Sequence, residues 1–150
     1  MELVCCRLVA PRKSNAAAIK KAPPRRDRWK EFWHTLAELR AFCPTAQPVV
    51  VRFSALPDTM LGHCVRRAKR FLIRLNAQMD EPQACDVLVH EWAHAMAWSF
   101  SLEALANRKG TTPEEFDAVS HDETWGCSYS RAWRVYTAAM QKFDLAQLTR

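Results

Sequence analysis

Two histidines stand four residues apart inside one long apolar stretch, in the segment His90-Glu91-Trp92-Ala93-His94. Apolar residues on both sides of the segment recur at helical spacing, and Asp80-Glu81-Pro82 upstream is a helix start signal. We therefore predict a buried helix that runs from about residue 81 to about residue 100. Residues four apart lie one turn above each other on a helix, so both imidazoles can bind one metal ion.

An HExxH segment of this kind is typical of zinc peptidases. Zinc held by two such histidines lowers the pKa of a bound water towards about 7, and Glu91 is then placed to act as the general base. The alternative is a metal-free core in which Glu91 is the ion partner of the two histidines. Burying three polar groups within five residues without a metal is costly, so we favour the metal site.

A catalytic zinc site has three protein ligands and one open position, and three residues downstream of the motif are candidates for the third ligand. We favour His121, because it is the only histidine after the motif and lies where the last helix is predicted to begin. Glu123 is the alternative ligand, although Ser120 and Glu123 have the spacing of a capping box that would occupy the carboxylate. Asp122 fits better as a residue that orients a ligand.

The rest of the chain predicts an α+β fold. Apolar residues at helical spacing over 29–42 predict an N-terminal amphipathic helix. The β-rich run 49–53 and the alternating residues 64–76 predict a short antiparallel sheet with a half-exposed strand. An apolar stripe over 125–143 predicts a long C-terminal helix, in which Tyr129 and Tyr136 are either core residues or hydrogen-bond donors to a reacting carbonyl.

The charge of the chain is unevenly distributed. The 150 residues carry a net charge of +6, yet residues 1–30 alone hold nine basic and two acidic side chains. We therefore expect a basic, flexible arm over residues 1–25 and a single domain over residues 26–150. Such an arm could follow a phosphate backbone, which makes nucleic acid a candidate partner, or it could serve only solubility.

Cysteine use and hydropathy bear on the compartment. No apolar run reaches the roughly 18–20 residues that a membrane span needs, and the first residues lack the pattern of a signal peptide. The six cysteines include no CxxC pair, so we expect reduced thiols in a cytoplasmic protein without a membrane partner. Cys64 invites comparison with deformylases, which combine an upstream cysteine with HExxH, but it fits a buried strand residue better.

Several of these segments together resemble the SprT-like (Spartan-type) zinc metallopeptidase family, whose members are zincins. The resemblance covers about residues 45–143 and is carried by residues 61–64, 70–76, 81–82 and 90–94. It resumes at His121-Asp122-Glu123-Thr124-Trp125, where a histidine is followed four residues later by an aromatic residue. The chain departs from the family in a longer connection between His94 and His121, in Asp122 where the family has glycine, and in lacking a cysteine-rich zinc ribbon.

The resemblance implies a minimal zincin fold with one zinc ion and with Glu91 as the general base. It implies three zinc ligands, which are His90, His94 and His121. It also implies that one strand borders the substrate cleft and pairs with an extended peptide, with Leu72, Arg74 and Asn76 as the substrate-binding residues.

The function expected from these features is a zinc metalloendopeptidase that hydrolyses peptide bonds in protein substrates, including DNA-associated proteins. Two alternatives stay open at this point. One is a deformylase-like, metal-dependent hydrolase of another amide, and the other is a non-catalytic binding module that zinc stabilises.

Overall fold

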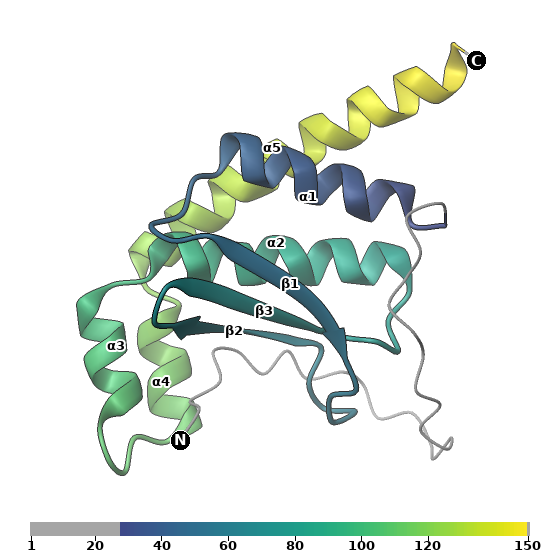
Figure 1. The fold of residues 1–150 in the computed structure, drawn as a ribbon. Coiled ribbons are helices and arrows are strands. Elements are labelled where there is room, and N and C mark those ends of the chain that lie inside the picture. The colour runs from purple at the N-terminus through teal and green to yellow at the C-terminus, as the bar shows by residue number, and fades with distance from the viewer. Residues whose placement is uncertain (1–27, 150) are drawn as a thin grey trace.

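Three short strands form one mixed sheet at the side of the molecule (Figure 1). The computed structural model describes residues 28–149, in which β1 (Val49–Ser54), β2 (Gly62–Arg67) and β3 (Arg70–Asn76) are ordered β1-β3-β2. β3 pairs antiparallel with β2 and parallel with β1. The prediction of an antiparallel sheet is therefore wrong for β1. The chain reverses direction after β1 and again after β2, so β3 runs in the same direction as β1 and takes the central position.

Five helices complete the described part of the chain. They are α1 (Lys30–Phe42), α2 (Glu81–Ala97), α3 (Phe100–Asn107), α4 (Pro113–Ser120) and α5 (Glu123–Leu148). α2 lies in the middle, because it contacts β2 and β3 as well as α1 and α5. α3 and α4 pack together at one end of the sheet, and the far end of α5 projects beyond α1 (Figure 1). The predicted α+β class, with a first helix before the sheet and a long last helix, is confirmed.

The helix that carries the HExxH segment starts as the sequence predicts and ends earlier. The Asp80 carboxylate accepts a hydrogen bond from the Gln83 backbone N–H at 3.0 Å and so caps the first turn. The predicted end near Phe100 is wrong, because Trp98 leaves helical geometry (φ −58°, ψ 125°) and Ser99 caps a separate helix, α3. α4 begins with a capping box, in which Thr112 and Glu115 each accept a hydrogen bond from the other's backbone N–H.

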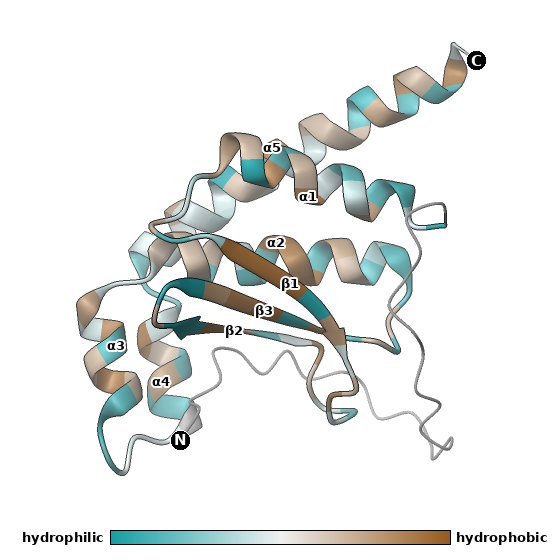
Figure 2. Cartoon of the chain, in the orientation of Figure 1, coloured by the Kyte–Doolittle hydropathy of each residue, from teal (hydrophilic) through white to brown (hydrophobic). Residues whose placement is uncertain are grey.

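The hydrophobic core lies between the sheet, α1 and α2. Phe32, Leu36 and Leu39 recur along one face of α1 and are buried there. The apolar residues of β1 and of the middle of α2 stand out in Figure 2, and both elements contribute to the hydrophobic core. The prediction that β3 is half-exposed is wrong, since Leu72 and Asn76 are buried together with the face that holds Ile73.

Two further predictions concern the basic arm and the absence of a membrane span. The basic arm predicted over residues 1–25 lies outside the described residues. Within the part of the chain that the structure describes, no helix is both long enough and apolar enough to span a bilayer.

Candidate metal centre

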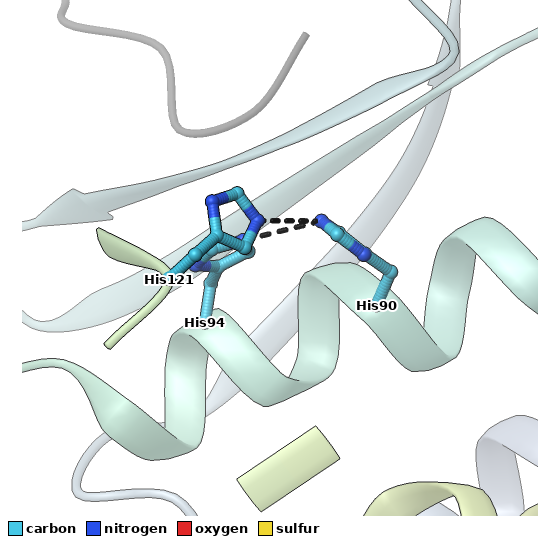
Figure 3. A group of neighbouring side chains, drawn as sticks. All are labelled: His90, His94 and His121. Atoms are coloured by element: carbon cyan, nitrogen blue, oxygen red, sulfur yellow. Dashed lines mark hydrogen bonds between the residues drawn. The ribbon is translucent and has the colours of Figure 1, made fainter. Parts of the chain in front are cut away.

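Three histidine side chains from two places in the chain converge beside α2. His90 and His94 come from consecutive turns of that helix, and His121 comes from the short junction between α4 and α5 (Figure 3). The Nε2 atom of His90 lies 3.3 Å from Nε2 of His94 and 3.3 Å from Nε2 of His121. The ligand atoms of all three lie within 4.8 Å of one another, so the three histidines are close enough to bind a metal ion.

The spacing of these nitrogens matches what zinc-like coordination requires. Tetrahedral ligands at a metal–nitrogen distance of about 2.0–2.1 Å stand about 3.3–3.4 Å apart. His90 keeps that distance to both of its neighbours. Among residues 28–149 the group contains no fourth histidine, cysteine or carboxylate, so the side chains leave room in the coordination sphere.

His121 is held in the orientation and tautomer that metal binding needs. Its Nδ1 atom lies 2.9 Å from the backbone carbonyl oxygen of Asp117 and 3.3 Å from the carboxylate oxygen Oδ1 of the same residue. Both partners accept hydrogen bonds, so Nδ1 carries the proton and donates it, which leaves the lone pair on Nε2. Sequence reasoning missed Asp117. Its only signal in the sequence is the four-residue spacing to His121.

Burial keeps the two helix histidines neutral. Burial lowers the pKa of His90 to about 4, an effect that His121 adds to and Asp117 opposes. Burial also lowers the pKa of His94 to about 2, with smaller contributions from His90 and His121. Neutral imidazoles present lone pairs rather than protons, so both side chains are ready to act as ligands at neutral pH.

Glu91 is fully buried next to His90 in the chain. Neither carboxylate oxygen has a hydrogen-bond partner of good geometry among the described residues. Burial raises the pKa of Glu91 well above its usual range. A hydrogen bond from the backbone of Cys64 lowers this pKa in part, and the charge of Asp117 raises it further. A buried carboxylate without a firm partner is costly, and a nearby dication offsets that cost. The donor set and this buried carboxylate therefore fit a divalent metal ion.

Aromatic rings form one wall of the centre. The ring centroid of Trp125 lies 4.5 Å from that of His121, 5.0 Å from His90 and 5.4 Å from His94. Tyr129 stacks on Trp125 at 5.0 Å with an interplanar angle of 10°, and its centroid is 5.9 Å from that of His90. Both rings lie on α5 at the four-residue spacing that begins with His121. They shield the histidines from water on that side.

The alternative ligand candidates lie elsewhere. Asp122 is exposed and caps α5, since its carboxylate accepts a hydrogen bond from the Trp125 backbone N–H at 2.9 Å. Glu123 is exposed and does not belong to the histidine group. The predicted capping box between Ser120 and Glu123 is wrong. Ser120 is the last residue of α4, and its hydroxyl donates a hydrogen bond to the backbone oxygen of Asp117.

The residues predicted to bind substrate lie on β3, and β3 is the central strand. Both of its edges are paired, with β1 on one side and β2 on the other, so the prediction that this strand pairs with a peptide is wrong. Leu72 is buried, and Arg74 is half-buried opposite His63 on β2. The buried Asn76 amide donates to the backbone oxygens of Leu56 and Met60 and thereby holds the loop between β1 and β2.

Cys64 and the two other histidines of the described residues stand outside the histidine group. Cys64 is fully buried on β2 and stands outside the histidine group, as expected for a strand residue. His63 is also buried, whereas the ring centroid of His34 lies 5.7 Å from that of Phe143 on α5.

No family model matches the chain, and neither a curated protein nor a solved structure gives a significant match to it.

Proposed function

We propose that this protein is a zinc-dependent metalloendopeptidase. The observation that carries the proposal is the convergence of the three histidine Nε2 atoms beside a buried glutamate that directly follows the first of them. Imidazole nitrogens are preferred ligands of zinc, and three of them with an open position form a common catalytic arrangement. A closed structural site would need a fourth side-chain ligand, which is absent from the group among residues 28–149.

The chain's own residues divide the chemistry between them. His90, His94 and His121 would hold the ion, which when bound supplies a Lewis acid and lowers the pKa of water to about 7. A carboxylate of Glu91 accepts a proton from the attacking water and returns it to the leaving amine. Asp117 keeps Nε2 of His121 available, and the Trp125 ring limits access of bulk water to the histidines.

The substrate class and partners belong to the same proposal. A peptide carbonyl is the group that a three-histidine centre with a buried general base is suited to attack. DNA-associated proteins as substrates, and nucleic acid as a partner of the basic residues 1–25, rest on the family resemblance and on charge alone. Among the described residues, Cys43, Cys64, Cys85 and Cys127 form no disulfide, which fits a reducing compartment such as the cytoplasm.

The decisive experiment separates metal binding from hydrolysis. Purified protein loaded with zinc is compared with Glu91→Gln and with Glu114→Gln, which changes an exposed glutamate on α4. We expect all three proteins to hold about one zinc by mass spectrometry of metals. Hydrolysis of an unfolded protein substrate should fall by roughly 100-fold or more only in Glu91→Gln. Equal hydrolysis by Glu91→Gln and the unmodified chain would rule out the mechanism. Tight zinc without any hydrolysis would favour a structural role.

A further inference from the structure

A row of aromatic side chains runs along α5 away from the metal centre. It begins at Trp125 and continues with Tyr129, Trp133 and Tyr136, which we call the aromatic row. Successive ring centroids lie 5.0 Å, 6.0 Å and 5.3 Å apart. The first ring contacts the three histidines, so the row leads outward from the place where chemistry would occur.

The aromatic row is accessible along its length. Trp133 is exposed by 37%, whereas Tyr129 and Tyr136 are half-buried with one side packed on the core. Trp125, Tyr129 and Trp133 stand four positions apart and so advance by about 6 Å each along the helix, and Tyr136 follows after three positions; alternate residues of an extended peptide advance by about 6.6–6.8 Å. Side chains that point to one side of an extended peptide can therefore meet successive rings of the row.

Acidic side chains border the row. Asp86 is exposed on α2 one turn before His90, on the side of that helix that faces the row. Its charge is close enough to raise the pKa of both Tyr129 and Tyr136, in addition to the effect of burial. Glu31 on α1 acts on Tyr136 in the same direction.

The basic residues of α5 are placed away from the row. Arg131 donates to the backbone oxygen of Phe42, and Lys142 pairs with Glu38 on α1. Arg134 lies on the opposite side of α5 from Trp125, since nine residues at 100° per residue bring it half a turn around the helix. Aromatic faces next to a carboxylate attract a cation more strongly than an anion or a neutral group.

We propose that the aromatic row and Asp86 bind a lysine or arginine side chain of the peptide substrate, a few residues to one side of the scissile bond. This inference rests on the proposed function, because it assigns the substrate preference of the same centre. The cation packs against the accessible sides of the Tyr129 and Tyr136 rings and is paired with the Asp86 carboxylate. Trp133, the exposed ring of the aromatic row, covers the aliphatic part of the lysine or arginine side chain.

The first test measures binding without hydrolysis. Two peptides of identical sequence, one with a single arginine and one with glutamine in its place, are titrated into ¹⁵N-labelled Glu91→Gln protein. The indole N–H signal of Trp133, assigned by its loss in Trp133→Leu, should shift and report about fivefold tighter binding of the arginine peptide. Equal binding of the glutamine peptide, or tighter binding of a short oligothymidine, would overturn the inference.

Exposed positions supply the variants and matched controls. Asp86→Asn, followed by the Trp133 indole signal, and Trp133→Leu, followed by isothermal titration calorimetry because it lacks that signal, should each remove most of the fivefold preference. Asp58→Asn and Phe100→Leu change an exposed acidic and an exposed aromatic residue elsewhere and should leave the preference intact. Loss of the preference in the controls, or its survival in both Asp86→Asn and Trp133→Leu, would place the cation somewhere other than the aromatic row and Asp86.

The second test uses zinc-loaded protein and quenched fluorescent forms of the same peptides. We expect kcat/KM to be about fivefold higher for the arginine peptide, and Asp86→Asn to equalise the two peptides. Cleavage without an arginine preference would overturn the inference and leave the proposed function standing. A binding preference without any cleavage would leave the cation site standing and overturn the proposed function.

Discussion

The Nε2 atoms of His90 and His121 lie 3.3 Å apart, although the two residues are 31 positions apart in the chain. No local preference of the backbone requires this approach. It depends on α5 packing against α2, which brings the start of α5 beside the middle of the HExxH helix. The third position of the centre is therefore a product of tertiary packing.

Removal of the third histidine should weaken metal binding selectively. We expect His121→Ala to lower zinc affinity by about 100-fold or more. This loss exceeds the usual effect on metal affinity of changing a residue that only hydrogen-bonds to a metal ligand. Competition with a chromophoric chelator measures this affinity.

Glu123→Ala should bind zinc like the unmodified chain, because Glu123 is exposed and outside the histidine group. Asp122→Ala should also keep its zinc while losing about 1 kcal/mol of stability with the α5 cap. Undiminished zinc in His121→Ala would exclude that histidine from the centre.

Asp117 should affect the metal through His121. We expect Asp117→Asn to weaken zinc binding by about 10-fold, at the low end for such partners, since the backbone oxygen of residue 117 still accepts from Nδ1 at 2.9 Å. The absorption spectrum of the cobalt-substituted protein would report a changed ligand field. Glu114→Gln on the same helix is the control. An unaltered affinity and spectrum in Asp117→Asn would show that the carboxylate does not orient the ring.

Buried His63 should make stability depend on pH. Burial, with help from Arg74, lowers its pKa from 6.5 to about 4, so the unfolded chain takes up a proton at this residue first. Stability is then lost as pH falls from about 6.5 to about 4, by about 3 kcal/mol at most. Urea unfolding of metal-free protein at pH 7.5 and pH 4.5 should show a smaller pH difference for His63→Leu than for the unmodified chain. Identical pH differences in the two proteins would contradict the assignment.

The contact between Gly62 and Val87 should tolerate no added methyl group. A Cβ at position 62 would lie 2.6 Å from Val87 Cγ1 and 3.2 Å from the backbone oxygen of Arg74. We expect Gly62→Ala to cost about 1–3 kcal/mol of unfolding free energy. The same change should cost at least about 1 kcal/mol less when Val87→Ala is already present, as a double-mutant cycle in urea would measure. Simple additivity of the two changes would show that the β2–α2 contact is not tight.

Local patterns were sufficient to predict the first helix, the HExxH helix and the long last helix, together with two of the three clustered histidines, whereas α3 was not predicted. The spacing of His90 and His94 and the capping residue Asp80 are contained in one short segment, so periodicity and cap chemistry are informative there. His121 could be proposed because few candidates follow the motif. Asp117 could not, because a helical acidic residue four positions before a histidine is common on protein surfaces.

Strand pairing could not be predicted from the same patterns. Alternation along residues 70–76 indicates a strand but does not say which neighbours it has, and β3 turned out to have one on each side. That placement buries Leu72 and Asn76 and excludes peptide pairing at this strand. The end of α2 at Ala97 was missed for a related reason, since Ser99 is one polar residue in an otherwise helix-compatible run.

The distance between His90 and His121 in the chain has a consequence for folding as well as chemistry. An ion shared by the two would act as a reversible cross-link that closes a loop of 31 residues, with α3 and α4 inside it. By the chain-entropy account used for disulfides, a loop of that length restricts the unfolded chain by about 3–4 kcal/mol. The concentration of the metal would then determine how much the packing of α5 against the rest of the domain is stabilised.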